Sequence, residues 1–176
     1  RWAEGYKSAA YAEGRIVKRE FDIALPAGMT ALAFNTRRPF FHDPRVRQAL
    51  ILLFDFEFIN RSLYFGLFQR SESYFARSML AANGRPADAR ERQLLAPFKD
   101  AVKPDVLEGR YRFPTSDASG QNRDNWRRAF ELLKAAGYEQ KGGKLVHAAT
   151  GQNLSFDILA NTTAHPQLLA SFTNDL

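Results

Sequence analysis

The three histidines, His42, His147 and His165, are the first residues to test for metal or acid–base chemistry. They lie far apart in the sequence and lack an HxxxH or HExxH spacing, so a zinc site would need ligands from distant segments. The chain contains no cysteine, which excludes disulfides and thiolate catalysis. The sequence therefore predicts no metal site and no cofactor.

Groups that could serve acid–base or nucleophilic catalysis are better explained by local structure. Two pairs of carboxylates lie close together in the sequence: Asp55 with Glu57, and Asp88 with Glu91. Helix capping or surface charge accounts for each pair. Ser116-Asp117 is typical of a turn, and no histidine is indicated as its partner. Glycine-rich phosphate loops and nucleophile elbows do not occur. We predict that the chain is not an enzyme.

Arg37 and Arg38 are the main candidates for binding. They follow a predicted buried strand and precede a predicted helix N-terminus, where ligands collect in open α/β sheets. A guanidinium group can hold a carboxylate or phosphate through two hydrogen bonds. With Asn35, this pair is expected to contact such a ligand. In the alternative, the arginines bind loop carbonyls or acidic residues in a partner lobe.

Tyr74 and Phe75 lie in a predicted loop over residues 69–86 and are the second binding candidates. Exposed rings can form a platform for a ligand, whereas buried rings would fill the core. The sequence alone favours the core role, and the binding role stays open as a hypothesis.

Hydrophobic periodicity predicts strands at residues 15–23 and 29–35. Asp43-Pro44 is a helix start, and Asp55 is expected to cap a second helical segment that ends near Gly66. The first helix has one apolar stripe: Val46, Ala49, Leu50, Leu53 and Phe54.

The second half of the chain continues this mixture of helices and strands. A helix from Asp88 would bury Leu94, Leu95 and Phe98, and a long loop is expected over residues 103–120. A helix capped by Asn122 or Asp124 and ending at Gly137 has a predicted buried stripe: Trp126, Ala129, Phe130, Leu133 and Ala136. Residues 144–148 and 154–160 predict a hairpin around a turn at 150–152, and residues 165–176 a helix. The fold class is α/β with a mixed sheet, in a single domain over residues 1–176.

A formal charge of +6 makes nucleic acid a partner to consider. However, the basic residues are dispersed and acidic residues are interleaved with them, which favours a solvated surface. We expect no nucleic-acid partner. A basic nucleic-acid-binding module and a fragment of an enzyme whose active residues lie elsewhere remain the alternatives.

Several motifs resemble the signature of the family-5 extracellular solute-binding proteins of ABC importers. They are Phe34-Asn35-Thr36, Pro39-Phe40-Phe41, Asp43-Pro44-Arg45-Val46-Arg47-Gln48-Ala49-Leu50 and Phe54-Asp55. The runs Asn35-Thr36-Arg37-Arg38, Ser73-Tyr74-Phe75 and Ser116-Asp117-Ala118-Ser119-Gly120 are similar to the YejA-like oligopeptide-binding branch.

This resemblance implies two α/β lobes of the type II periplasmic-binding-protein kind, which close over a solute. The chain would be most of the second lobe, with the first lobe and the C-terminal continuation absent. The implied ligand is an oligopeptide or modified peptide, and the implied partners are ABC permease subunits. The implied location is the periplasm, after export by a signal peptide outside this fragment. Asn35, Arg37, Arg38, Tyr74 and Phe75 are the candidate ligand contacts.

Overall fold

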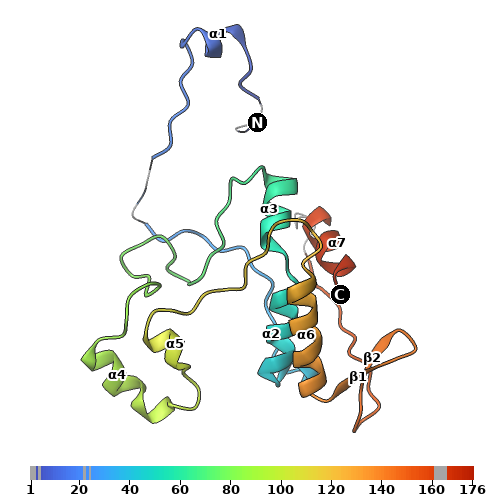
Figure 1. Cartoon of the computed structure of the whole chain (residues 1–176). Coiled ribbons are helices and arrows are strands. Elements are labelled where there is room, and N and C mark those ends of the chain that lie inside the picture. The colour runs from blue at the N-terminus through green and yellow to red at the C-terminus, as the bar shows by residue number, and fades with distance from the viewer. Residues whose placement is uncertain (1–2, 4, 22, 24, 161–165) are drawn as a thin grey trace. The chain divides into compact units, whose positions relative to one another are not determined.

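The computed structural model describes residues 3, 5–21, 23, 25–160 and 166–176 (Figure 1). The chain divides into two compact units, Arg1–Ala31 with Gln69–Phe113 (unit 1) and Leu32–Phe68 with Pro114–Leu176 (unit 2). Unit 1 contains α1 (Ala9–Ala12), α4 (Ala89–Leu95), η2 (Ala96–Phe98) and α5 (Pro104–Leu107). Unit 2 contains η1 (Pro39–Phe41), α2 (Pro44–Leu53), α3 (Phe56–Tyr64), α6 (Arg123–Ala135), β1 (Tyr138–Lys141), β2 (Lys144–His147) and α7 (Pro166–Asn174).

The core of unit 2 forms where α2 packs against α6 (Figure 1). The predicted stripe of α2 is confirmed at Val46, Ala49 and Leu50, which are all buried. On α6, Ala129 and Leu133 are buried as predicted, but Trp126 and Phe130 are exposed. The buried face of α6 is rotated, since Asn125 joins it by donating to the Thr115 carbonyl at 3.2 Å. A side-chain amide that makes a hydrogen bond can therefore be buried on the face of a helix where the hydrophobic pattern predicted aromatic rings.

Helix capping sets the boundaries of α2 and α3, as the sequence predicts. The Asp43 side chain accepts a hydrogen bond from the Arg45 amide, with Pro44 at the first helical position. The Asp55 side chain accepts from the Phe58 amide at 2.9 Å and starts α3. That helix ends at Tyr64, where Phe65 adopts a left-handed conformation and the Gly66 amide donates to the Asn60 carbonyl. Two short helices thus replace one long one.

The hairpin of unit 2 uses a different partner from the predicted one. Strand β2 pairs antiparallel with β1, through the turn at Gly142-Gly143, in the register Tyr138 to His147. The predicted second arm, residues 154–160, is not a strand, and only an isolated bridge joins Val146 to Asn153. The turn before it does form, because the Gly151 amide donates to the His147 carbonyl. Strand β2 thus pairs with β1 on one edge. On its other edge it meets the predicted arm only at residues 152–154, where the His147 amide donates to the Gln152 carbonyl and the Leu154 amide donates to the Leu145 carbonyl.

The predicted strands at 15–23 and 29–35 are also wrong: the described residues of these ranges form no strand. Residue 22 lies outside the described residues. A strand is stable only when a neighbour pairs with its backbone. No described segment provides that pairing, and the apolar side chains of Phe21 and Ile23 are exposed. Helices and a small sheet occur together as predicted, but the sheet of the described residues has two antiparallel strands. The single-domain boundary stays a prediction.

Unit 1 is held largely by polar contacts to its backbone. Helix α4 starts with a full capping box, in which Asp88 and Glu91 each accept from the other's amide at 2.8 Å. The Arg92 side chain donates to the carbonyls of Ala87 and Leu107. Leu94 and Phe98, which were predicted to be buried, are exposed. Capping therefore fixes this helix without a buried face.

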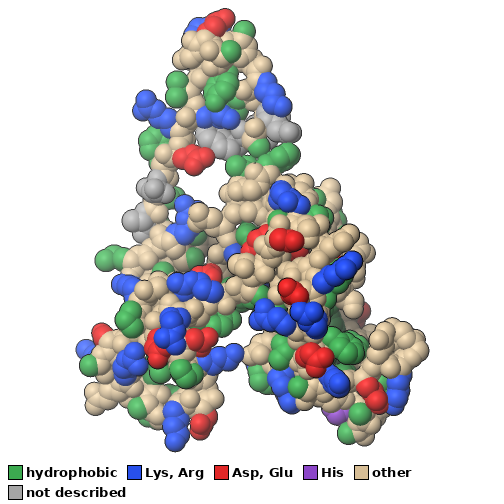
Figure 2. Space-filling view, viewed as in Figure 1, with side chains coloured by type: hydrophobic (Ala, Val, Ile, Leu, Met, Phe, Trp, Pro, Cys, Tyr) green, Lys and Arg blue, Asp and Glu red, His purple; other side chains and the backbone are tan. Residues whose placement is uncertain are grey.

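The charged side chains are interspersed on the face shown in Figure 2, where Lys and Arg alternate with Asp and Glu. This agrees with the dispersed charge expected from the sequence. No helix among the described residues is both long enough and apolar enough to cross a bilayer.

We predict that Leu133→Ala lowers the free energy of unfolding of residues 1–176 by about 2–5 kcal/mol, because it leaves a cavity between α6 and α2. The matched control is Leu159→Ala, at a leucine that is 96% exposed, which should change stability by less than about 0.5 kcal/mol. Urea unfolding measures both. Equal stabilities of the two variants would contradict the α2–α6 core.

Candidate functional site

Asn35, Arg37 and Arg38 lie together in one tight turn of unit 2, residues 35–38, which we call the arginine turn. The Asn35 side-chain oxygen accepts from the Arg37 amide at 3.2 Å, and the Asn35 carbonyl accepts from the Arg38 amide at 3.0 Å. Asparagine favours such a turn because its side chain can mimic a backbone carbonyl. Asn35 therefore shapes the turn from which both arginine side chains project.

Aromatic packing anchors the arginine turn on both sides. Phe34 precedes it and Phe41 follows it, and their ring centroids lie 5.2 Å apart. The Phe41 ring, which is buried, also lies 4.5 Å from Phe40 and 5.4 Å from Phe156. Tilted and edge-on ring pairs at these distances are attractive. The chain contains 15 phenylalanines, but the sequence pattern does not identify which of them form this cluster.

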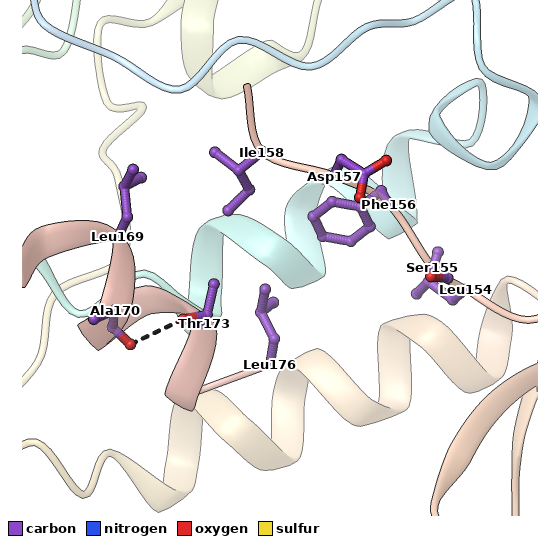
Figure 3. Close-up of a pocket in the computed structure, with 9 residues that line it drawn as sticks. All are labelled: Leu154, Ser155, Phe156, Asp157, Ile158, Leu169, Ala170, Thr173 and Leu176. Carbon is purple, nitrogen blue, oxygen red and sulfur yellow. Dashed lines mark hydrogen bonds between the residues drawn. The ribbon is translucent and has the colours of Figure 1, made fainter. Parts of the chain in front are cut away.

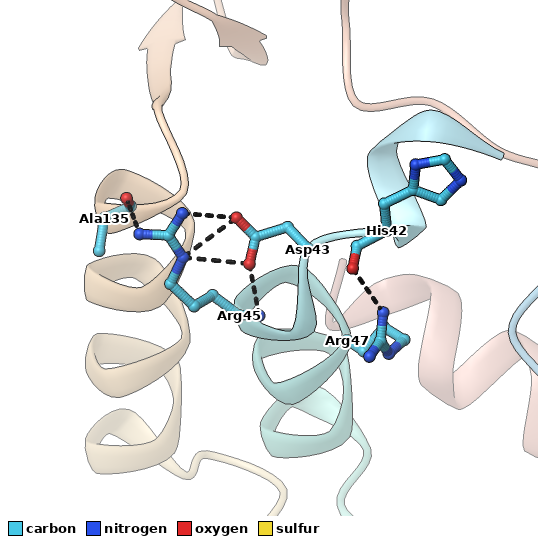
Figure 4. A network of polar contacts seen from close by, with 5 residues as sticks. All are labelled: His42, Asp43, Arg45, Arg47 and Ala135. Atoms are coloured by element: carbon cyan, nitrogen blue, oxygen red, sulfur yellow. Dashed lines mark hydrogen bonds and ion pairs between the residues drawn. The ribbon is translucent and has the colours of Figure 1, made fainter. Parts of the chain in front are cut away.

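Arg45 and Arg47 hold the helix that follows the turn (Figure 4). Arg45 pairs with both carboxylate oxygens of Asp43 at 2.6–3.0 Å and also donates to the Ala135 carbonyl at the end of α6. Arg47 donates to the carbonyls of Phe41 and His42. The hydrogen bond from Arg45 is the largest cause that holds the pKa of Asp43 below its ordinary value. The guanidinium groups of these two arginines therefore bind partners within unit 2 and stabilise it.

Arg37 and Arg38 differ from that pair because their side chains are exposed. Within the described part of the chain, neither guanidinium makes a hydrogen bond or an ion pair. The alternative in which they bind loop carbonyls is therefore wrong for these residues, and a partner lobe stays untested. Two neighbouring guanidinium groups on a fixed turn can bind a carboxylate or a phosphate.

Tyr74 and Phe75 lie in a loop of unit 1, residues 73–80, which we call the aromatic loop. The Ser73 carbonyl accepts from the Ala76 amide at 3.2 Å, and the Phe75 carbonyl accepts from the Ser78 hydroxyl at 2.8 Å. Tyr74 is 80% exposed and Phe75 is 50% exposed. The core role favoured by the sequence is therefore wrong for both rings.

The sequence also gave no indication of Met79 and Leu80, which extend the exposed apolar surface of this loop. Polar ties fix the chain around it. The Arg85 side chain donates to the Met79 carbonyl at 2.9 Å, and Glu72 accepts from the Phe113 amide at 3.4 Å. An exposed apolar surface on a loop that hydrogen bonds hold in place can contact a ligand or another part of a protein.

The groups considered for catalysis are used structurally. The Asp55 carboxylate accepts from the Ser116 hydroxyl at 2.5 Å, and Glu57 accepts from the Ser116 amide at 3.1 Å. The Asp117 carboxylate accepts from the Ser119 amide. The side-chain hydrogen bond of Ser119, followed by this backbone hydrogen bond, holds the pKa of Asp117 below its ordinary value. The segment is thus the predicted turn, tied to the start of α3.

The two described histidines occupy separate places in unit 2. His42 is exposed after η1, whereas the His147 ring packs edge-on against Tyr138 at 5.1 Å; His165 lies outside the described residues. Three or more metal-ligating side chains do not converge anywhere in the described ranges. The arginine turn and the aromatic loop belong to different units, and each is a separate candidate.

The sequence profile of the bacterial extracellular solute-binding proteins, family 5, middle region, matches residues 5–176. The chain is therefore a member of this family of extracellular solute-binding proteins, as its motifs indicated.

Relatives support the narrower resemblance. The chain is 40% identical to a probable peptide-binding protein, YejA, of Agrobacterium fabrum, covering 100% of this chain and 29% of the relative. It is 38% identical to the peptidoglycan-binding protein YepA of the same organism, covering 99% of the chain and 28% of the relative. A putative binding protein of Brucella melitensis is 42% identical, with 100% and 28% covered. The chain thus spans less than a third of these relatives.

We predict that Asp43→Ala lowers the free energy of unfolding at pH 7 by about 0.5–2 kcal/mol, because the cap of α2 is lost. A folded-state pKa below the ordinary 3.8 means that Asp43 contributes stability above that value, and the contribution disappears as the pH falls through the lowered pKa. The difference between wild type and variant should therefore shrink in acid.

Thermal unfolding across pH measures this difference. The control variant is Arg37→Ala, because the Arg37 side chain is exposed and has no partner among the described residues. A constant difference between wild type and Asp43→Ala from pH 7 to strong acid would contradict the charged cap.

Proposed function

We propose that the chain is part of the solute-binding component of an ABC importer and that it binds oligopeptides in the periplasm. Two lobes would close over the peptide, exclude water from it and present it to the permease subunits in the membrane. The chain would supply most of the second lobe. No chemical step is part of this function.

The exposed arginine pair carries the proposal. A peptide brings at least one carboxylate, at its C-terminus, and a guanidinium recognises that group through paired, charge-assisted hydrogen bonds. Among the described residues, the guanidinium groups of Arg37 and Arg38 make no hydrogen bond, whereas those of Arg45 and Arg47 do. The arginine turn therefore has the chemistry to select anionic ends of peptides, and Asn35 positions it.

The family membership and the printed name of the YejA relative support a peptide as the ligand. The name of the YepA relative supports a second candidate, a peptide-bearing fragment of peptidoglycan. Both ligands carry carboxylates, so both suit the arginine turn. The interspersed acidic side chains weigh against the nucleic-acid alternative, and the family match weighs against the enzyme alternative.

We predict that Arg37→Ala and Arg38→Ala in the full-length protein each weaken binding of a free oligopeptide by about tenfold or more, since a hydrogen bond to a charged group contributes about 1.5–3 kcal/mol. Calorimetry measures the affinity. Amidating the C-terminus of a peptide without acidic side chains should weaken binding to wild type and have little effect on binding to the double variant Arg37→Ala/Arg38→Ala.

The matched control is Arg123→Ala, which removes another exposed arginine of unit 2. Unchanged affinity in both turn variants would remove the arginine turn from the ligand site. Comparing the free peptide with its disaccharide-linked form decides between the two ligand classes.

The aromatic loop is a separate proposal. Tyr74→Ala should weaken peptide binding by about 3- to 10-fold, because a ring contact contributes about 0.5–1.5 kcal/mol beyond burial, whereas Tyr74→Phe should keep most of the affinity. Phe75→Ala should behave like Tyr74→Ala. Calorimetry on the full-length protein again gives the measurement, and wild-type affinity in both alanine variants would exclude the loop.

A further inference from the structure

The four residues that follow α3, residues 65–68, expose three large apolar side chains of unit 2. We call them the phenylalanine tip. Phe65 and Phe68 are each 57% exposed, and Leu67 is 49% exposed. Single exposed apolar residues are ordinary on a protein surface, whereas exposed apolar residues that gather in one place mark binding surfaces.

Hydrogen bonds hold the backbone of the phenylalanine tip against the end of α3. The Asn60 side chain accepts from the Phe68 amide at 3.1 Å and donates to the Phe68 carbonyl at 2.7 Å. The Asn60 carbonyl accepts from the Gly66 amide at 2.9 Å, and the Tyr64 carbonyl accepts from the Leu67 amide at 3.0 Å. The Phe68 ring also packs edge-on against the Tyr64 ring, with their centroids 4.8 Å apart. The apolar side chains of the tip are therefore presented on a fixed backbone.

The backbone conformation of Phe65 is unusual for its residue type. Its φ of 56° and ψ of 27° are left-handed, at the position after a helix where glycine or asparagine is usual. A bulky side chain is disfavoured in this conformation, and such residues cluster at functional sites. Folding alone would favour asparagine or glycine at position 65, so the exposed ring points to binding.

The size of the phenylalanine tip suits a small occupant. With about 200 Å² for a whole aromatic side chain, its exposed apolar area is roughly 300 Å² at most. A stable protein interface buries about 800 Å² on each partner. A second copy of the chain or another protein would therefore need far more surface than the tip offers, whereas one or two apolar side chains match it.

A groove of about 500 Å³ between residues 154–158 and α7 also has apolar walls (Figure 3). Its lining includes the carboxylate of Asp157, and the residues that join its two walls, 161–165, lie outside the described structure. The phenylalanine tip has no charged side chain, and all of its residues are described. Of the two surfaces, the tip is therefore the one whose chemistry and fixed backbone define an apolar binding site.

We propose that the phenylalanine tip binds an apolar side chain of the peptide ligand and thereby selects among peptides. This inference rests on the peptide-binding function proposed above. It adds a selectivity that the arginine turn lacks, because a guanidinium group recognises a carboxylate and not an apolar side chain. Contact between the rings of the tip and an aliphatic or aromatic side chain removes the apolar surface of both from water.

The first test is calorimetry on the full-length protein with a set of alanine peptides in which leucine replaces alanine at each position in turn. At one position or more, the leucine peptide should bind wild type at least about fivefold more tightly, since leucine has three more carbon atoms to bury. Phe65→Asn and Phe68→Ala should each reduce this preference to less than about twofold. The matched control is Phe130→Ala, at a ring of α6 that is 41% exposed, and it should keep the preference.

The same measurements distinguish this inference from the proposed function. If wild type binds none of the peptides, the proposed function fails, and this inference fails with it. If wild type binds them and amidation of the C-terminus weakens binding, the proposed function stands. In that case, the absence of a leucine preference, or its persistence in both tip variants, would overturn the inference alone.

The melting temperature of the full-length protein without peptide tests whether the Phe65 ring has a structural role instead. Phe65→Asn should melt at the wild-type temperature or above it, because asparagine adopts the left-handed conformation more readily than phenylalanine. A lower melting temperature would show that the ring packs against another part of the protein, and it would overturn the inference.

Discussion

The packing of α2 against α6 is the interaction around which the rest of unit 2 is built, and the ion pair between Asp43 and Arg45 fixes where the two helices meet. One carboxylate caps α2 through the Arg45 amide and binds the Arg45 guanidinium at the same time. Because that guanidinium also reaches the Ala135 carbonyl, the start of α2 is fixed to the end of α6. Phe41 belongs to the α2–α6 core and packs on Phe34, which directly precedes the arginine turn.

This arrangement separates two uses of arginine within eleven residues of sequence. Arg45 and Arg47 bind carbonyls and a carboxylate of their own unit, so their charge is compensated and their geometry is fixed. Arg37 and Arg38 lie on a turn that the same contacts hold in place, and their guanidinium groups stay available. A family of solute-binding proteins needs both roles: a rigid scaffold and polar groups that a solute can reach.

The local parts of the fold could be predicted from sequence because they depend on neighbouring residues. Asp43, Asp55, Asp88 and Asn122 cap the helices where capping preferences put them. Strand positions were harder, since residues 29–35 and 154–160 have suitable patterns but no described partner. The exposure of Tyr74 and the burial of Asn125 also depended on contacts with distant residues, which a local pattern does not contain.

The sequence by itself determined the helix starts, the apolar stripe of α2, the family and the identity of the candidate binding residues, because each rests on residue types at short spacing. Only the tertiary structure decided which arginines are occupied, which rings are buried and which extended segments find a strand partner. Those properties require atoms that are far apart in sequence, such as Arg45 and the Ala135 carbonyl, to meet in space. Whether a side chain is buried or a strand is paired depends on a second segment of the chain. The local sequence pattern of one segment therefore cannot determine it.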